Sequence, residues 1–185
     1  MTRGVEFVKI LYVKPVVTED KLLKKLKKKT CEVSGVALTY YPYWIFYFKA
    51  ELWRLLMKPR VVRLVVSVDG VTGKPAQGGP EVDKEGKLKH VEGEEVEGQM
   101  LVKLEVCEEE ALRQAESFAK RYMAYLFPGK NIKLEVERRE LIYRPFWLVK
   151  MRDVIKALDA IDGEEITIST SSAIKGRREE GSELH

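Results

Sequence analysis

Few residues of this 185-residue chain are of types that carry out covalent chemistry. The two histidines, His90 and His185, lie in a polar segment and at the last position, and neither is paired with the serine or acid of an activated nucleophile. Cys31 and Cys107 lack both CxxC spacing and a nearby histidine, so we expect buried thiols or one disulfide rather than a metal site. The sequence therefore predicts a protein that is not an enzyme and that uses no metal and no cofactor.

Two Asp-Gly pairs are the remaining candidates for acid chemistry. Asp69-Gly70 and Asp162-Gly163 each follow an apolar run, and no third carboxylate completes a ligand set. Asp-Gly after an apolar run is typical of a tight turn, because aspartate caps the turn and glycine tolerates positive φ. We interpret both pairs as structural.

The clearest binding chemistry is aromatic. Residues 40–48 read YYPYWIFYF, seven aromatics in nine positions. Because side chains alternate along a strand, Trp44 and every second residue after it would face a core, while Tyr43 and Tyr47 would be partly exposed. Aromatic side chains beside cations are typical of single-stranded nucleic-acid surfaces and of protein interfaces.

The predicted interaction surface combines these tyrosines with basic and apolar residues at corresponding positions farther along the chain: Tyr43, Tyr47, Lys49, Arg63, Phe146, Lys150 and Arg152. The aromatic motif itself is expected to be structural, with Trp44 and Trp147 in cores. Pro42 and Pro145 lack an N–H and are expected at a bend, an edge or a strand start.

An internal repeat supplies the elements that position these residues. Three pairs of similar segments occur in the same order: FVKILYV (7–13) with LVKLEVC (101–107), YYPYW (40–44) with YRPFW (143–147), and VVRLVVSVDG (61–70) with VIKALDAIDG (154–163). Each copy is predicted to contain a strand (5–13 or 99–107), a helix (18–30 or 108–127), a long aromatic strand (32–53 or 131–152) and a last strand that ends at Asp-Gly.

The predicted fold class is α+β, with two tandem βαββ repeats related by a pseudo-twofold axis and each antiparallel sheet packed by its own helix. The expected organisation is a first repeat (1–73), a polar Gly-, Pro- and Glu-rich linker or excursion (74–97), a second repeat (98–172) and a flexible tail (173–185). Whether the repeats form one sheet or two is left open.

Charge is unevenly distributed along the chain. Residues 1–73 hold fourteen Lys and Arg against six Asp and Glu, whereas the remainder is net acidic. The stretch KLLKKLKKK (21–29) is expected to be a helix with a solvated lysine face, and its alternative is a phosphate contact through Lys24, Lys25 and Lys28. Such an asymmetric chain is suited to anionic partners or to head-to-tail contact with copies of itself.

The aromatic strand followed by VVSVDGVTGKP resembles tandem PepSY-like, or more broadly cystatin-like, modules. Asp69, Thr72 and Gly73 match the Asp-x-x-Thr-Gly ending of such a strand, and the second copy, IDGEEIT, lacks the Thr-Gly. The resemblance implies a strand–helix–strand–strand architecture and a binding or regulatory role, and it carries no functional residues to this chain.

The N-terminal residues have no secretory leader pattern, and the run from Val33 to Phe48 is too short to span a bilayer. We therefore expect a cytoplasmic protein without a membrane partner. The leading functional hypothesis is a non-catalytic interaction module that forms homo-oligomers through the aromatic and basic sheet face. Nucleic-acid binding by the first repeat and small-molecule binding between the repeats are the alternatives.

Overall fold

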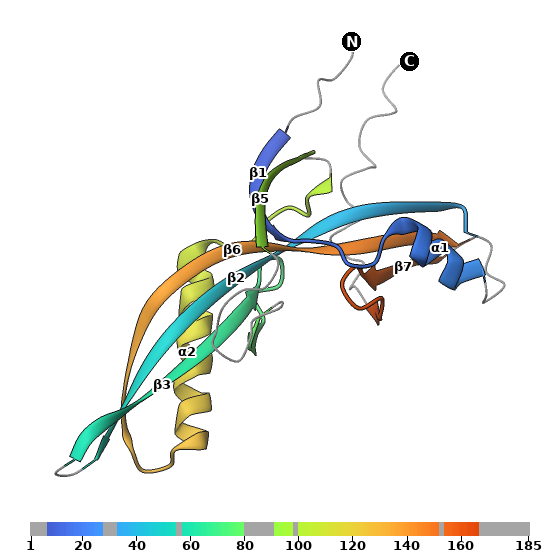
Figure 1. Cartoon of the computed structure of the whole chain (residues 1–185). Coiled ribbons are helices and arrows are strands. Elements are labelled where there is room, and N and C mark those ends of the chain that lie inside the picture. The colour runs from blue at the N-terminus through green and yellow to red at the C-terminus, as the bar shows by residue number, and fades with distance from the viewer. Residues whose placement is uncertain are drawn as a thin grey trace, which may run out of the picture. The chain divides into compact units, whose positions relative to one another are not determined.

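The computed structural model describes residues 7–27, 33–54, 57–79, 91–97, 100–151 and 154–166, and shows a mostly antiparallel sheet with two described helices (Figure 1). The elements follow in the order β1 (Phe7–Val13), α1 (Glu19–Lys27), β2 (Gly35–Arg54), β3 (Met57–Asp69), β4 (Pro75–Gln77), β5 (Val91–Glu97), α2 (Glu108–Leu126), β6 (Asn131–Met151), β7 (Val154–Asp159) and β8 (Glu165–Ile166). The α+β class is thus confirmed.

The chain divides into two compact units, and neither is a continuous piece of sequence. Unit 1 comprises residues 1–15 and 40–145, and unit 2 comprises residues 16–39 and 146–185. The long strands β2 and β6 each contribute to both units.

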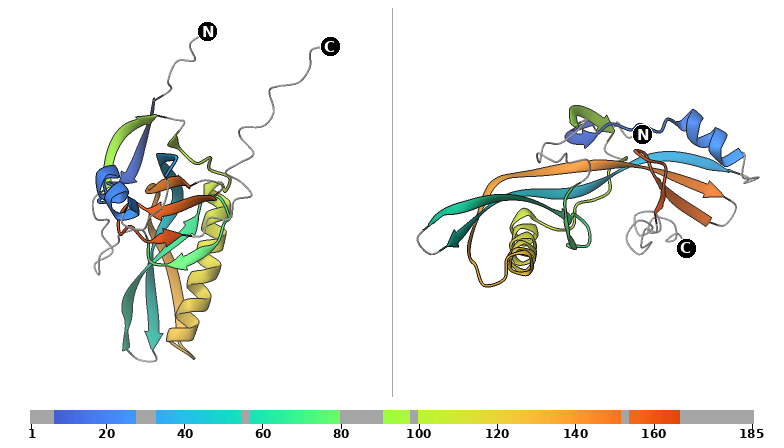
Figure 2. Two further views of the ribbon diagram at one scale, coloured as in Figure 1. Left: turned by 90° about the vertical axis from the view of Figure 1, so that its right-hand side faces the viewer. Right: turned by 60° about the horizontal axis from the view of Figure 1, so that its bottom comes forward.

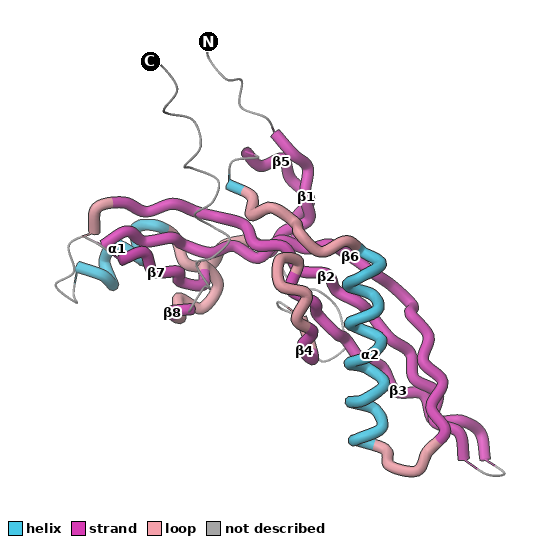
Figure 3. The backbone as a smooth tube through the Cα atoms, turned by 180° about the vertical axis from the view of Figure 1, so that it is seen from behind, coloured by secondary structure: helices cyan, strands magenta, loops and turns pink. Residues whose placement is uncertain are grey.

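Unit 1 contains the strand order β4–β3–β2–β6–β1–β5. β2 and β3 form an antiparallel hairpin that pairs continuously from Tyr43 with Asp69 to Leu52 with Arg60. β1 pairs antiparallel with β5 and is bridged in parallel to β6 between Tyr12 and Tyr143. Helix α2 lies along one face of β2 and β3 (Figures 2 and 3).

The core of unit 1 joins this helix to the aromatic strand. The buried side of α2 presents Ala111, Ala115, Ala119 and Met123 at helical spacing. These residues pack against every second residue of β2 and of β3. The buried strand residues of this cluster are Phe46, Phe48, Ala50, Leu52, Leu64, Val66 and Val68. The predicted alternation of β2 is therefore confirmed on this side.

Unit 2 uses the shorter helix. The last part of β6 pairs antiparallel with β7, and β7 pairs with β8. Leu22 and Leu26 of α1 pack on Trp147, Val149 and Leu158. The apolar positions predicted on this strand, Trp147 and those that follow it, are core residues here as well.

One prediction about the helices is wrong. Each helix was expected to cover the aromatic strand of its own repeat, yet α2 packs on the β2–β3 hairpin and α1 packs on the β6–β7 hairpin. The connections favour this exchange, because backbone N–H groups just before each helix bind the turn of the other hairpin. Val16 and Val17 donate to Ala160 O at 2.9 and 2.8 Å, and Glu105 and Val106 donate to Gly70 O at 3.0 and 2.9 Å.

Two predicted elements also change. Residues 102–107 form no strand, although 99–107 was expected to be one, and Leu101 makes only an isolated bridge to Tyr40. The stretch 74–97, interpreted as a linker or excursion, instead contributes β4 and β5 to the sheet. Alternation in LVKLEVC indicated a strand, but these backbone groups bind the turn at Gly70 rather than a neighbouring ladder.

The two prolines mark where hairpin pairing begins. The β2–β3 ladder starts at Tyr43, directly after Pro42, and the β6–β7 ladder starts at Phe146, directly after Pro145. A proline has no N–H to donate, so it fits the position just before a ladder.

Candidate binding site

The predicted tyrosine surface is largely covered by its own chain. Tyr47 is only 8% exposed, because the Arg138 guanidinium lies 4.0 Å from the centre of its ring. Its hydroxyl donates to Glu140 Oε2 at 3.4 Å. Burial raises the pKa of Tyr47, and Arg138 opposes this shift. The expected exposure of Tyr47 is therefore wrong, since a strand about ninety residues away in sequence supplies its cover.

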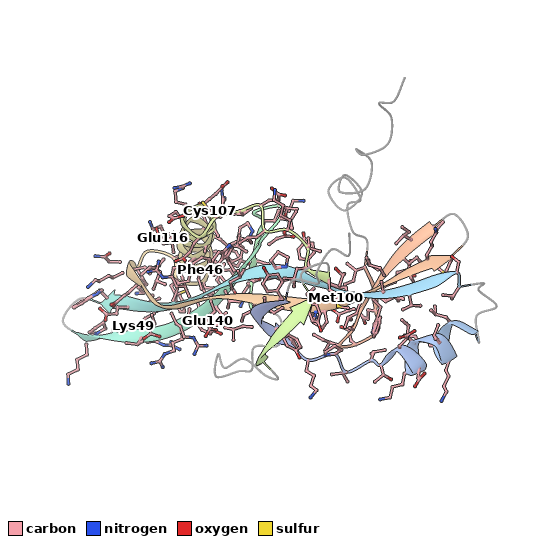
Figure 4. The ribbon with its side chains drawn as sticks, turned by 90° about the horizontal axis from the view of Figure 1, so that it is seen from above. Phe46, Lys49, Met100, Cys107, Glu116 and Glu140 are labelled. Carbon is pink, nitrogen blue, oxygen red and sulfur yellow. The ribbon has the colours of Figure 1, made fainter. Side chains whose placement is uncertain are left out.

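The basic residues beside Tyr47 face carboxylates. Lys49 Nζ lies 2.8 Å from Glu51 and 4.0 Å from Glu135, and Arg63 Nε lies 3.4 Å from Glu137. Figure 4 shows Lys49 and Glu140 on the side of the sheet opposite Glu116 of α2. Exposed pairs of this kind contribute little to stability, but they make this face mixed in charge rather than basic.

The remaining residues of the predicted surface are divided between the units. Tyr43 is half-buried in unit 1 beside Tyr41, with ring centres 5.4 Å apart. In unit 2, Phe146 is buried, Lys150 is exposed and its carbonyl accepts from Ser34, and Arg152 lies outside the described residues. The predicted surface is thus divided between the two units.

The aromatic motif and the turns have structural roles. Trp44 Nε1 donates to Val106 O at 2.9 Å in unit 1, and Trp147 Nε1 donates to Val17 O at 2.7 Å in unit 2. Each indole thereby fixes the segment that leads into the helix covering it.

The two turns correspond at a register different from the one predicted. Asp69 Oδ1 accepts from the N–H groups of Val71 and Thr72 at 2.8 Å. The equivalent residue in unit 2 is Asp159, which accepts from Ile161 N at 2.7 Å, and not Asp162. Gly73 and Gly163, each at positive φ, close the two turns by donating to these aspartates' carbonyls at 2.9 Å. The predicted equivalence of Asp69-Gly70 with Asp162-Gly163 is therefore wrong by three residues, and Asp69-Gly70 corresponds to Asp159-Ala160.

The lysine helix has a partly structural role. Lys24 is exposed, Lys25 Nζ donates to Gly163 O at 3.0 Å, and Lys28 lies outside the described residues. A cleft of about 420 Å³ lies beside this contact, between α1 and the β6–β7 hairpin. Its floor is apolar, its rim carries two lysines and two glutamates, and its lining includes Leu22, Lys25, Leu26, Met151, Lys156, Leu158, Glu164 and Glu165.

A second concentration of basic residues, besides the lysine helix, was not identified from the sequence. Residues 53–63 and 117–134 contain no Asp or Glu. Their described basic side chains are all exposed: Lys58, Arg60, Arg63, Lys120, Arg121, Lys130 and Lys133. The absence of acids in both stretches was visible in the sequence, but nothing there indicated that the stretches meet.

The two stretches meet at one end of unit 1. The start of β6 lies beside the end of β2, because Glu135 forms an ion pair with Lys49. Lys133 is also close enough to Glu51 to add to the lowering of the Glu51 pKa by Lys49. Figures 1 and 3 show the last part of β2, the first part of β3 and the α2–β6 connection at the same end of the unit. We call this region the basic end, comprising Trp53, Lys58, Arg60, Val61, Lys120, Arg121, Tyr125, Leu126, Lys130 and Lys133.

The basic end also exposes apolar side chains. Trp53 and Val61 are each 46% exposed, Leu126 is 44% exposed and Tyr125 is 81% exposed. An exposed tryptophan among cations is informative, whereas an isolated exposed leucine is not.

Among the described residues no group of three or more His, Cys, Asp or Glu could hold a metal ion. Cys107 is exposed at the start of α2, which corrects the expectation of a buried thiol, and Cys31 is not described. Of the described helices, neither has the length and apolar character needed to span a bilayer.

Comparison of the chain with protein-family models, with curated proteins and with solved structures finds no match.

Proposed function

We propose that this chain is a non-catalytic binding module that contacts an anionic partner through the basic end of unit 1. The observation that carries the proposal is the meeting of two acid-free stretches, with exposed aromatic and aliphatic side chains among their cations. Concentrated positive charge attracts anionic partners over about 10 Å at moderate ionic strength, and exposed apolar area then strengthens the contact.

The basic end supports this function better than the sheet face expected to mediate self-association. Lys49 and Arg63 on that face are next to Glu51 and Glu137, and the ring of Tyr47 is covered. Lys58, Arg121 and Lys130 stand in stretches that contain no carboxylate.

The test is salt-dependent retention on two anionic supports, heparin and vesicles that contain phosphatidylserine. We expect the wild type to bind at least one of them at low salt and to be released as salt rises. Arg121→Gln/Lys130→Gln should weaken binding about tenfold or more, whereas the control Lys74→Gln/Lys103→Gln, which removes two exposed cations elsewhere in unit 1, should not. Absence of binding to both supports would refute the proposal.

We further infer that the two repeats of the sequence, 1–73 and 98–172, are copies of one βαββ module whose helices exchanged partners. The support is a set of recurring contacts: an indole N–H to the segment before the helix, two N–H groups from that segment to a turn carbonyl, and a turn closed by a glycine of positive φ. A duplicated module explains why corresponding contacts occur in both halves of the chain.

A second candidate function is small-molecule binding in the unit 2 cleft. Its volume, apolar floor and charged rim are those of small ligand sites. An amphipathic anion such as anilinonaphthalene sulfonate tests it. Lys25→Gln should weaken the bound fluorescence severalfold, and equal binding by both proteins would argue against this site.

A further inference from the structure

We propose that the anionic partner of the basic end is a lipid bilayer surface, onto which unit 1 docks with Trp53, Tyr125 and Leu126 entering the headgroup region. This inference rests on the proposed function and names the class of its partner. Binding of this kind is peripheral and requires no membrane-spanning segment.

The mixture of side chains favours lipid over nucleic acid. An exposed aliphatic group such as Leu126 offers bases no stacking face, but it gains by leaving water for the interfacial region of a bilayer. Tryptophan and tyrosine are enriched at that depth, because their rings are apolar and carry one polar group. The aromatic ring best placed as a base platform on the sheet, Tyr47, is already covered by Arg138.

The position of the charges fits a surface rather than a groove. The cations come from separate elements around the apolar side chains: Lys58 and Arg60 from β3, Lys120 and Arg121 from α2, Lys130 from the connection after α2, and Lys133 from β6. Long basic side chains can keep their charge at the lipid headgroups while their stems lie along apolar neighbours.

The nearest acids in each element mark where the docking surface ends. They are Glu51 on β2, Glu116 on α2 and Glu135 on β6. Glu51 contacts Lys49, and Glu116 contacts Lys120 at 3.8 Å. Beyond these positions an anionic surface would meet like charge, so docking is expected at the tip of the unit only.

Two contributions are needed for stable docking, and the basic end offers both. Each Lys or Arg close to an anionic leaflet strengthens binding about fivefold. Burial of the exposed part of Trp53 adds roughly a further tenfold. Either contribution alone gives weak, reversible binding, which is the usual behaviour of single membrane signals.

The decisive experiment is flotation of the full chain with vesicles of phosphatidylcholine containing about 30% phosphatidylserine, with pure phosphatidylcholine vesicles as the reference. We expect flotation with the anionic vesicles only, together with a blue shift of tryptophan emission. The shift should disappear in Trp53→Phe, because Trp44 and Trp147 belong to the cores, while most of the flotation remains.

A matched pair of variants separates the docking surface from general exposure. Leu126→Ser and Leu11→Ser remove apolar side chains that are 44% and 42% exposed, and both belong to unit 1. Leu126→Ser should lower vesicle affinity about threefold or more, and Leu11→Ser should leave it unchanged. Equal effects of the two variants would overturn the proposed docking surface.

The remaining outcomes distinguish this inference from the proposed function. A 20-nucleotide single strand that binds through Arg121 and Lys130, without vesicle binding, would overturn the lipid inference and keep the proposed function. Light scattering tests for self-association. If the chain self-associates in a salt-sensitive way, loses this in Arg121→Gln/Lys130→Gln and does not bind vesicles, the partner of the basic end is a second copy of the chain and the lipid inference is overturned. Failure to bind both vesicles and heparin would overturn the lipid inference and the proposed function.

Discussion

Unit 1 and unit 2 contain corresponding hydrogen bonds, but their hydrophobic cores are very different. In unit 1 a helix of 19 residues lies on the sheet, whereas the described helix of unit 2 has 9. The turns, the indole contacts and the glycines of positive φ nevertheless correspond. Polar contacts at the turns therefore do not determine how much apolar surface is buried beside them.

The difference in packing begins with side-chain size on the helices. Ala111, Ala115 and Ala119 are all fully buried and allow α2 to approach large residues of β2 such as Phe46 and Phe48 closely. In unit 2 the helix presents larger side chains, and Leu22 and Leu26 pack in a cluster that mixes large and small partners, Trp147 and Leu158 with Val149 and Ala160. Leucines project farther than alanines, and the cleft of about 420 Å³ remains beside them.

Truncation of one core residue in each unit should produce the largest effect. Phe46→Ala removes a fully buried ring under α2 and should lower the free energy of unfolding by about 3–5 kcal/mol. Val149→Ala removes two methyl groups in the looser core and should cost about 2 kcal/mol. Urea unfolding followed by circular dichroism measures both values.

Equal losses for Phe46→Ala and Val149→Ala would show that the core of unit 2 is packed at least as tightly as that of unit 1, because Val149→Ala removes far fewer atoms, and would contradict the comparison drawn from the cleft. A control on the exposed side of the same hairpin, Val61→Ala, should change stability by less than about 0.5 kcal/mol.

A smaller effect is expected at the turn position where the units differ by one methyl group. A Cβ on Gly70 would lie 2.8 Å from Pro42 O and 2.8 Å from Leu104 Cδ1, so Gly70→Ala forces backbone to move and should cost about 1–3 kcal/mol. Ala160, the equivalent residue in unit 2, is fully buried, and Ala160→Gly should cost about 1 kcal/mol. A neutral Gly70→Ala would mean that the two turns are equally spacious.

The sequence predicted the elements better than their partners. The core side of β2, from Phe46 to Leu52, and the helix that ends before Pro128-Gly129 followed from local pattern. The exchange of helices did not, because both helices are amphipathic and that pattern does not show on which hairpin each one packs. Nor did the displacement from Asp162 to Asp159, since both carboxylates accept from a backbone N–H two residues later and only Asp162 is followed by glycine.

The binding site was predicted least well, for a related reason. Tyr47 looked exposed because its neighbours in sequence grade into charge, yet Arg138 and Glu140 arrive from β6 and cover it. The basic end is assembled from stretches more than fifty residues apart, so only the strand order shows that they lie together. Composition alone reveals charge segregation along the chain but not in space.

The smallest predicted effect concerns pH and a residue specific to the first aromatic motif. Tyr41 donates to Asp69 Oδ1 at 2.9 Å, whereas the second motif has Arg144 at this position. Burial, together with the bond to Asp69, raises the pKa of Tyr41 above its ordinary value of 10.0. The folded state thus keeps the proton when the unfolded state loses it, so the contribution of Tyr41 is complete below pH 10 and declines as pH rises further.

Tyr41→Phe should therefore be less stable than the wild type by about 1 kcal/mol at neutral pH, through loss of the bond to Asp69. The two unfolding free energies should converge as pH rises above about 10, because only the wild type loses the contribution of this tyrosine. Tyr47 and Tyr143, whose pKa values burial also raises, weaken both proteins alike and leave the difference unaffected. Urea unfolding in steps up to about pH 11 measures the difference. If the unfolding free energies of the two proteins keep a constant difference up to about pH 11, the pKa of Tyr41 is not raised by folding. The hydrogen bond to Asp69 would then give the turn of unit 1 no pH-dependent stability that the turn of unit 2 lacks.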